Sequence, residues 1–181
     1  TSNIIGNRSF SHKASLVKKM GQICIKKFHQ NHIATVMKHI PGHGLAKVDS
    51  HKKLPVVNKD VKLLNKIDFL PFRRQKSYLA MTAHIVFSSL DSRNTVTHSK
   101  KIIKIIRDKI GYKNILMSDD ISMKALKYDL ITNAKKSLEA GCNLVLYCSG
   151  NIKDNYKLIK SLPYIDKFTS KKTSEIYKIL R

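Results

Sequence analysis

The sequence predicts an α/β fold in which about four parallel strands alternate with helices. Three features of the chain predict it: short, nearly continuous apolar runs recur, helical stripes separate them, and polar residues follow several runs directly. Strands of a parallel sheet read as continuous apolar runs because both of their faces are covered, so we expect helices on both faces. Ligands bind beyond the carboxyl ends of such strands, and the polar residues there are therefore the first candidates for a site.

The expected strands and helices alternate along the chain. Strands are predicted where apolar runs are short and bounded by polar or turn residues, over residues 33–37, 78–87, 114–119 and 144–148. Helices are predicted where apolar residues recur at helical spacing, over residues 13–29, 59–70, 99–110 and 123–138, with one or two more near the end. Ser99 suits an N-cap, and Gly141 suits the position just after a helix.

Composition indicates one soluble domain with an unusually basic surface. The 181 residues are 42% hydrophobic, which is enough to bury a core, and the formal net charge is +23. Such a charge suits nucleic acid, anionic lipid or an acidic substrate. The lysines are nevertheless spread along the whole chain and form no dense basic arm. We therefore expect an ordinary lysine-rich surface, with no specific nucleic-acid partner and no membrane partner.

Cysteine usage and the chain ends bear on where the protein acts. The 3 cysteines have no C-x-x-C spacing, which predicts neither a disulfide framework nor a zinc site, and free thiols are typical of the cytoplasm. No apolar stretch approaches the roughly 18–20 residues that span a bilayer. The chain begins with Thr1 and shows no signal peptide, so we expect either that a segment has been removed or that this is a fragment of a longer chain.

A histidine-rich segment follows the first expected strand. It reads Lys38-His39-Ile40-Pro41-Gly42-His43-Gly44 and is followed by Asp49-Ser50-His51. A metal site is disfavoured because a loop rich in glycine does not fix the tetrahedral geometry that three histidines would need. Asp49 and His51 fit an ordinary loop ion pair, and they also fit a catalytic pair in which a carboxylate orients an imidazole.

Two adjacent carboxylates lie at the carboxyl end of the third expected strand, and His84 lies towards that end of the second. Asp120 suits the N-cap of the next helix, whereas Asp119 occupies the last strand position, from which a side chain points into the mouth of the sheet. No nucleophile elbow, phosphate-binding loop, dinucleotide fingerprint or RNA-binding signature occurs.

Several motifs together carry a family resemblance. In order they are Ile5-Gly6-Asn7-Arg8-Ser9-Phe10, the segment from Lys38 to Gly44, Asp49-Ser50-His51, Met81-Thr82-Ala83-His84, Ser118-Asp119-Asp120-Ile121-Ser122-Met123 and Ala140-Gly141-Cys142-Asn143. Their order resembles that of the family 3 β-N-acetylglucosaminidases that bacteria use in peptidoglycan recycling. The second motif has Ile40 where the family usually has phenylalanine.

The resemblance implies a (β/α)8 barrel of which this chain is the C-terminal half. Residues 1–181 would be a partial catalytic domain without the N-terminal β/α units. Asp119 matches the nucleophile, His51 the acid/base residue and Asp49 its carboxylate partner. The residues that match the binding site for N-acetylglucosamine are Arg8, Lys38 and His39. The resemblance implies no metal and no cofactor.

The resemblance also implies the reaction and its substrate. The expected reaction is retaining hydrolysis of terminal β-linked N-acetylglucosamine, with muropeptides that carry it on an anhydromuramic sugar as substrates. An open half barrel would need a complementing N-terminal half or self-association. The alternatives are another specificity in the same family, such as β-glucosidase, an inactive remnant of a split or truncated gene, and a basic chain that binds nucleic acid nonspecifically.

Overall fold

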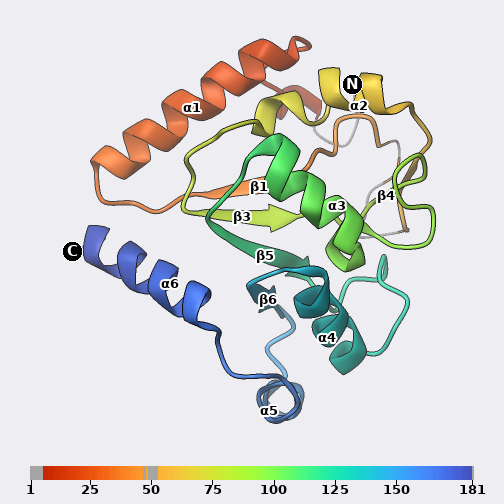
Figure 1. Ribbon diagram of the computed structural model, residues 1–181, viewed down its shortest axis with the longest axis vertical. Helices are drawn as coiled ribbons and strands as arrows, with labels where there is room; N and C mark the ends of the chain where they lie inside the picture. Colours follow the sequence, from red (N-terminus) through yellow and green to blue (C-terminus); the bar gives the residue numbers. More distant parts are fainter. Residues whose placement is uncertain (1–5, 47, 49–52, 181) are drawn as a thin grey trace.

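The computed structural model describes residues 6–46, 48 and 53–180, and its centre is a parallel sheet. Four strands lie in the order β1-β3-β5-β6, and every neighbouring pair is parallel. They are β1 (Val36–Ile40), β3 (Leu79–Thr82), β5 (Ile115–Asp120) and β6 (Leu144–Leu146). The predicted parallel α/β fold is confirmed, and Figure 1 shows the strands side by side with helices around them.

The helices follow the predicted order. They are α1 (Ala14–Gln30), α2 (Val61–Lys66), α3 (Lys100–Ile105), α4 (Leu130–Ala140), α5 (Ile152–Ser161) and α6 (Lys167–Ile179). Helix α1 is shifted by one residue, and α2, α3 and α4 are shorter than predicted. A π-helical turn, Ile106–Ile110, continues α3, and three 3-10 turns are η1 (Gly6–Arg8), η2 (Leu70–Phe72) and η3 (Val96–His98). Ser99 caps α3 by accepting from Ile102 N at 3.2 Å, and Gly141 follows α4 with φ of 115°, as predicted.

One face of the sheet carries the main core. Met37, Ala80 and Leu116 are direct neighbours across β1, β3 and β5. Ala80 and Leu116 are buried in one cluster with the apolar face of α3, and Met37 packs against that cluster. The α3 side chains in it are Ile102 and Ile103. Burial of these aliphatic groups is the main force that fixes α3 on this face.

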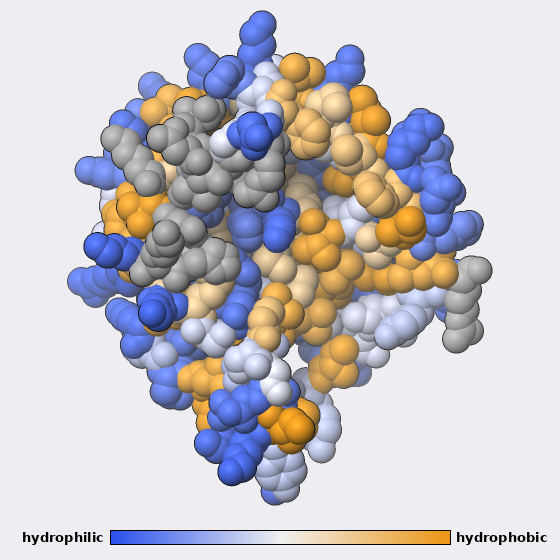
Figure 2. All heavy atoms as spheres, turned by 180° about the vertical axis from the view of Figure 1, so that it is seen from behind, coloured by the Kyte–Doolittle hydropathy of each residue, from blue (hydrophilic) through white to orange (hydrophobic). Residues whose placement is uncertain are grey.

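The opposite face of the sheet is open, so the prediction of helices on both faces is wrong. Lys38, Met81, Met117 and Leu144 form a row across the strands on this face. Lys38 is exposed, and Met117 and Leu144 are only half-buried. Seen from behind, the molecule presents apolar side chains around a hollow (Figure 2). Helices on one side only are the arrangement of a barrel wall, whose inner face is covered by other strands.

Three predicted elements differ from the structure. The first strand, predicted over residues 33–37, is β1 at Val36–Ile40, so Lys38 and His39 lie in the strand and not beyond it. The run over residues 78–87 is divided: after β3 the chain leaves the sheet, and β4 (Val86–Phe87) pairs with β2 (Val56–Val57) in a second sheet. The helix expected from residue 123 begins only at Leu130, because Asp129 supplies the N-cap. Its predicted apolar residues Met123 and Leu126 are buried all the same, in an irregular segment. The apolar spacing therefore predicted correctly that these two residues are buried, but it predicted a helical backbone where the segment is irregular.

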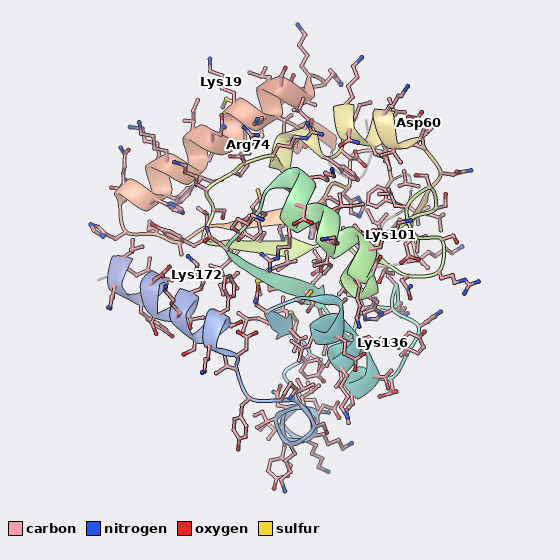
Figure 3. All side chains as sticks on the ribbon, in the orientation of Figure 1. Lys19, Asp60, Arg74, Lys101, Lys136 and Lys172 are labelled. Carbon is pink, nitrogen blue, oxygen red and sulfur yellow. The ribbon has the colours of Figure 1, made fainter. Side chains whose placement is uncertain are left out.

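The basic residues are distributed over the outer helices. Lys19, Lys101, Lys136 and Lys172 come from α1, α3, α4 and α6, as the side-chain view shows (Figure 3). Cations on four separate elements make a diffuse positive surface. This distribution is the one expected for lysine used as a general solvent-facing residue.

Candidate active site

Asp119 lies at the carboxyl end of β5, on the open face of the sheet. It follows Met117 by two positions, and alternate strand residues share a face. Its Oδ1 accepts a hydrogen bond from the backbone N–H of Asp120 at 2.8 Å, and the side chain is 13% exposed. One carboxylate oxygen is thus fixed by its own backbone, while the group as a whole remains reachable from the mouth of the sheet.

His39 comes from β1 and meets the other oxygen of the same carboxylate. Its Nε2 lies 3.4 Å from Asp119 Oδ2, although β3 separates the two strands in the sheet. Burial lowers the pKa of His39 to about 4, against the attraction of the Asp119 carboxylate. The imidazole is therefore neutral near pH 7, and each such ring has one N–H donor and one acceptor nitrogen.

The loop that follows His39 is held by a buried acid, Asp68. Asp68 Oδ1 accepts from Leu45 N at 3.1 Å, and burial raises the pKa of this carboxyl to about 6. A Cβ on Gly42 would lie 2.5 Å from the Asp68 Cβ, and Gly42 has φ of 152°. Only glycine permits this approach. Local packing therefore explains why the histidine-rich segment contains glycine at this position.

The sequence suggested that Asp120 caps a helix, and this prediction is wrong. The Asp120 carboxylate instead accepts hydrogen bonds from two loops at the end of β5. Its Oδ1 accepts from Ser122 N at 3.0 Å and from Cys148 N at 3.3 Å, and both carboxylate oxygens accept from Ser122 Oγ at 2.8 Å. Cys148 follows β6, so this carboxylate joins the ends of two neighbouring strands. These hydrogen bonds hold the end of β5 to the segment that follows β6.

The structure brings together some of the predicted site residues. Asp119 and His39 are adjacent, and Lys38 lies on the open face of β1 with an exposed side chain. Arg8 belongs to η1, and its side chain is not described. Asp49 and His51 lie outside the described residues. The contact between His39 and Asp119 joins two of these residues, and their roles stay predictions.

Two residues near the site were not selected from the sequence for a role in it. Asp68 interrupts an apolar run between Ile67 and Phe69, and a carboxylate in such a place signals a buried polar function. His84 was noted only as a polar residue beyond a strand, and it is 1% exposed with hydrogen bonds from both ring nitrogens. A buried histidine in the middle of an apolar run is the signal in the sequence that identifies it.

The described part of the chain holds neither a metal-binding cluster nor a membrane-spanning helix. No group of three histidine, cysteine, aspartate or glutamate residues in that part has the geometry to hold a metal ion. No helix there combines the length and hydropathy that crossing a bilayer requires.

Comparison with known proteins assigns the chain to a family. The profile described as the glycosyl hydrolase family 3 N terminal domain matches residues 1–175. The chain belongs to glycosyl hydrolase family 3. A curated relative, the beta-hexosaminidase of Actinobacillus succinogenes, is 32% identical over 173 residues, which are 90% of this chain and 50% of the relative. The beta-hexosaminidase of Shewanella frigidimarina is 32% identical over 157 residues, which are 83% of this chain and 46% of the relative.

Solved structures agree with this family 3 assignment. A family 3 beta-N-acetylglucosaminidase from Paenibacillus superposes with a TM-score of 0.86 at 26% identity, covering 98% of this chain and 36% of that one. NagZ from Neisseria gonorrhoeae, in complex with N-trifluoroacetyl-D-glucosamine, superposes with a TM-score of 0.85 at 27% identity, covering 97% and 52%. The chain spans about half the length of the curated relatives it matches. The family resemblance and the fold class predicted from the sequence are both confirmed.

Proposed function

We propose that this chain carries the nucleophile of a retaining glycoside hydrolase that removes terminal β-linked N-acetylglucosamine. The observation that carries the proposal is the placement of Asp119 at the carboxyl end of β5, partly exposed and next to His39. The carboxyl end of the strands is where barrel enzymes bind and convert their substrates. Family membership supports glycosidic bonds as the bonds that are cleaved.

In the proposed reaction, Asp119 Oδ2 attacks the anomeric carbon while the glycosidic bond breaks. His51 protonates the departing oxygen, and a covalent glycosyl-enzyme results. His51 then accepts a proton from water, whose oxygen displaces Asp119 from the sugar. An imidazole suits both steps because its reference pKa is about 6.5. Asp49 would orient the ring and favour its protonated form.

The substrate-binding part of the proposal rests on Arg8, Lys38 and His39. Arginine and lysine donate hydrogen bonds to sugar oxygens, and a neutral His39 can both donate and accept. We propose muropeptides with N-acetylglucosamine on an anhydromuramic sugar as the substrate, and the cytoplasm as the place of reaction. The reaction needs no metal or cofactor, because proton transfer and carboxylate attack use side chains alone.

The open face of the sheet supports a requirement for additional strands. The row of Lys38, Met81, Met117 and Leu144 would face the interior of a barrel, and β1 and β6 are the two edges of the four-stranded sheet. Exposed edges and apolar faces favour pairing with further strands. We propose that residues 1–181 form one part of a catalytic barrel and that a complementing N-terminal half or a second copy completes it.

The proposal is tested by following nitrophenolate release from 4-nitrophenyl β-N-acetylglucosaminide across a range of protein concentrations. We expect release by the native chain and none by Asp119→Asn. Asp60→Asn is the matched control because asparagine caps α2 as well as aspartate does, and it should behave like the native chain. A rate per molecule that rises with concentration would support assembly by self-association. A folded native sample that releases nothing at any concentration would exclude completion by a second copy. The absence of release when an N-terminal half of a family 3 hydrolase is then added would contradict the proposal.

A further inference from the structure

His84 occupies a buried position behind the end of β5. Its Nε2 lies 2.9 Å from the backbone carbonyl oxygen of Asp120, and its Nδ1 lies 2.8 Å from Thr97 Oγ1. A carbonyl oxygen only accepts hydrogen bonds, so Nε2 carries the proton and donates. In the neutral ring Nδ1 then accepts from the Thr97 hydroxyl. The contacts themselves define one tautomer of this histidine.

The hydrogen-bond chain continues behind His84. Thr97 Oγ1 lies 2.9 Å from Thr82 Oγ1, and both threonines are fully buried. Since the Thr97 proton is directed to His84, Thr82 donates to Thr97. Thr97 Oγ1 also lies 3.4 Å from the Ala83 carbonyl, a longer contact than its 2.8 Å to His84. With the shorter contact taken as the hydrogen bond, the chain runs from Thr82 at the end of β3, through Thr97 in η3 and His84, to the backbone of β5.

The residue that receives this hydrogen bond also holds the candidate nucleophile. The Asp120 N–H donates to Asp119 Oδ1 at 2.8 Å, and the Asp120 carboxylate accepts from Cys148 N at 3.3 Å. Asp120 is thus fixed at its N–H, its carbonyl and its side chain. With Oδ1 fixed by this N–H, Asp119 Oδ2 is the oxygen that meets His39.

We propose that His84 is a positioning residue that acts through Asp120 to orient the Asp119 carboxylate. This inference rests on the proposed function, in which Asp119 Oδ2 attacks the sugar. The Asp120 carbonyl belongs to the peptide group that joins Asp120 to Ile121, and the Asp120 N–H belongs to the one before it. By holding the carbonyl, His84 therefore limits rotation of the Asp120 backbone, which carries the N–H that reaches Asp119. His84 itself does not touch the substrate. Displacement of a reacting group by about 1 Å can cost about 100-fold in rate, so such a support has a measurable effect.

A purely structural histidine would fill space, and an apolar side chain could replace it in that role. An apolar side chain at position 84 leaves the Asp120 carbonyl and the Thr97 hydroxyl without this partner. Glutamine offers an amide nitrogen that can donate to the Asp120 carbonyl in place of Nε2. The comparison of His84→Leu with His84→Gln therefore separates orientation of Asp119 from filling of the core.

The test combines kinetics with NMR. We expect His84→Leu to lower kcat by about 10–100-fold with little change in KM, and His84→Gln to restore most of kcat. In proton–nitrogen spectra, the Asp120 amide should move upfield in His84→Leu and stay near its native shift in His84→Gln. Long-range spectra of the native His84 ring should report the Nε2–H tautomer. His98→Leu removes another ring, whose Nε2 lies 3.2 Å from the Asn133 carbonyl, and should leave the Asp120 amide in place.

The outcomes separate this inference from the proposed function. An unchanged Asp120 amide and unchanged kcat in a folded His84→Leu variant would overturn the positioning role, and so would an Nδ1–H tautomer. The variants can show the expected Asp120 amide shifts while the native chain shows no turnover. That result would support the positioning role and count against the proposed hydrolase. If His84→Leu does not fold, His84→Gln alone decides. An Asp120 amide shift that differs from the native shift in His84→Gln would overturn the inference, and an unchanged shift would support it.

Discussion

Replacing Asp68 with asparagine should remove a pH dependence of stability that this buried carboxyl creates. Asp68 is 3% exposed, and Oδ2 has no hydrogen-bond partner within the part of the chain that the structure describes. Burial raises the pKa of this group to about 6 from 3.8, although hydrogen bonds from Leu45 and Gly44 act in the opposite direction. The charged form of Asp68 is consequently destabilised in the folded protein.

The size of the effect follows from the difference between the two pKa values. The folded state binds the Asp68 proton more tightly than the unfolded state, so this group stabilises the fold at low pH and loses that contribution as pH rises from 4 towards 7. One pKa unit corresponds to about 1.4 kcal/mol, and a rise of about two units gives an upper value of about 3 kcal/mol. Asparagine cannot ionise, so the Asp68→Asn variant should show none of this loss of stability as pH rises.

The measurement is urea unfolding of the native chain and of Asp68→Asn between pH 4.5 and 7.5. The other shifted carboxyls, such as Asp91 and Asp129, have lowered pKa values and are present in both proteins, so their contributions cancel in the difference. Asp60→Asn, at the exposed N-cap of α2, controls for the substitution itself. The reasoning would be refuted if the difference in free energy of unfolding between the native chain and Asp68→Asn were constant across this pH range.

Two further predictions concern packing and buried polar groups. Gly42→Ala should cost about 2–4 kcal/mol, because its Cβ would lie 2.7 Å from a backbone oxygen. Gly150→Ala, which also has a positive φ but an open surrounding, should cost only about 1–2 kcal/mol, and equal losses in thermal melts would contradict the packing argument. Asn143→Leu should cost about 2–4 kcal/mol, because Asn143 Oδ1 accepts from Leu116 N at 2.9 Å and from Arg107 Nη2 at 2.8 Å. A loss below about 0.5 kcal/mol in urea unfolding would show that these donors find other partners.

The parallel fold was predictable because its signals are local. Four apolar runs separated by helical stripes were enough to predict the strands, and Ser99 and Gly141 identified helix ends by their own chemistry. The division of the 78–87 run was not predictable, because both halves are apolar and buried. Only their hydrogen-bond partners differ, and those partners come from distant parts of the chain.

The candidate site shows the same division. The polar residues that follow the strands identified Asp119 and His39 as candidates, since the carboxyl ends of parallel strands share one edge. The 3.4 Å contact between Asp119 and His39 depends on how β1, β3 and β5 align, which no local pattern encodes. The roles of Asp68 and His84 were equally hidden, because each acts on backbone atoms far away in sequence.

The sequence by itself determined the fold class, the family and the strand that carries the candidate nucleophile. These properties depend on residue type and spacing, which are written along the chain. The tertiary structure alone decided that one face of the sheet is open, that Asp120 joins two loops instead of capping a helix, and that His84 supports the end of β5. Such relations depend on distances between segments, and those are fixed only when the strands align and the core packs.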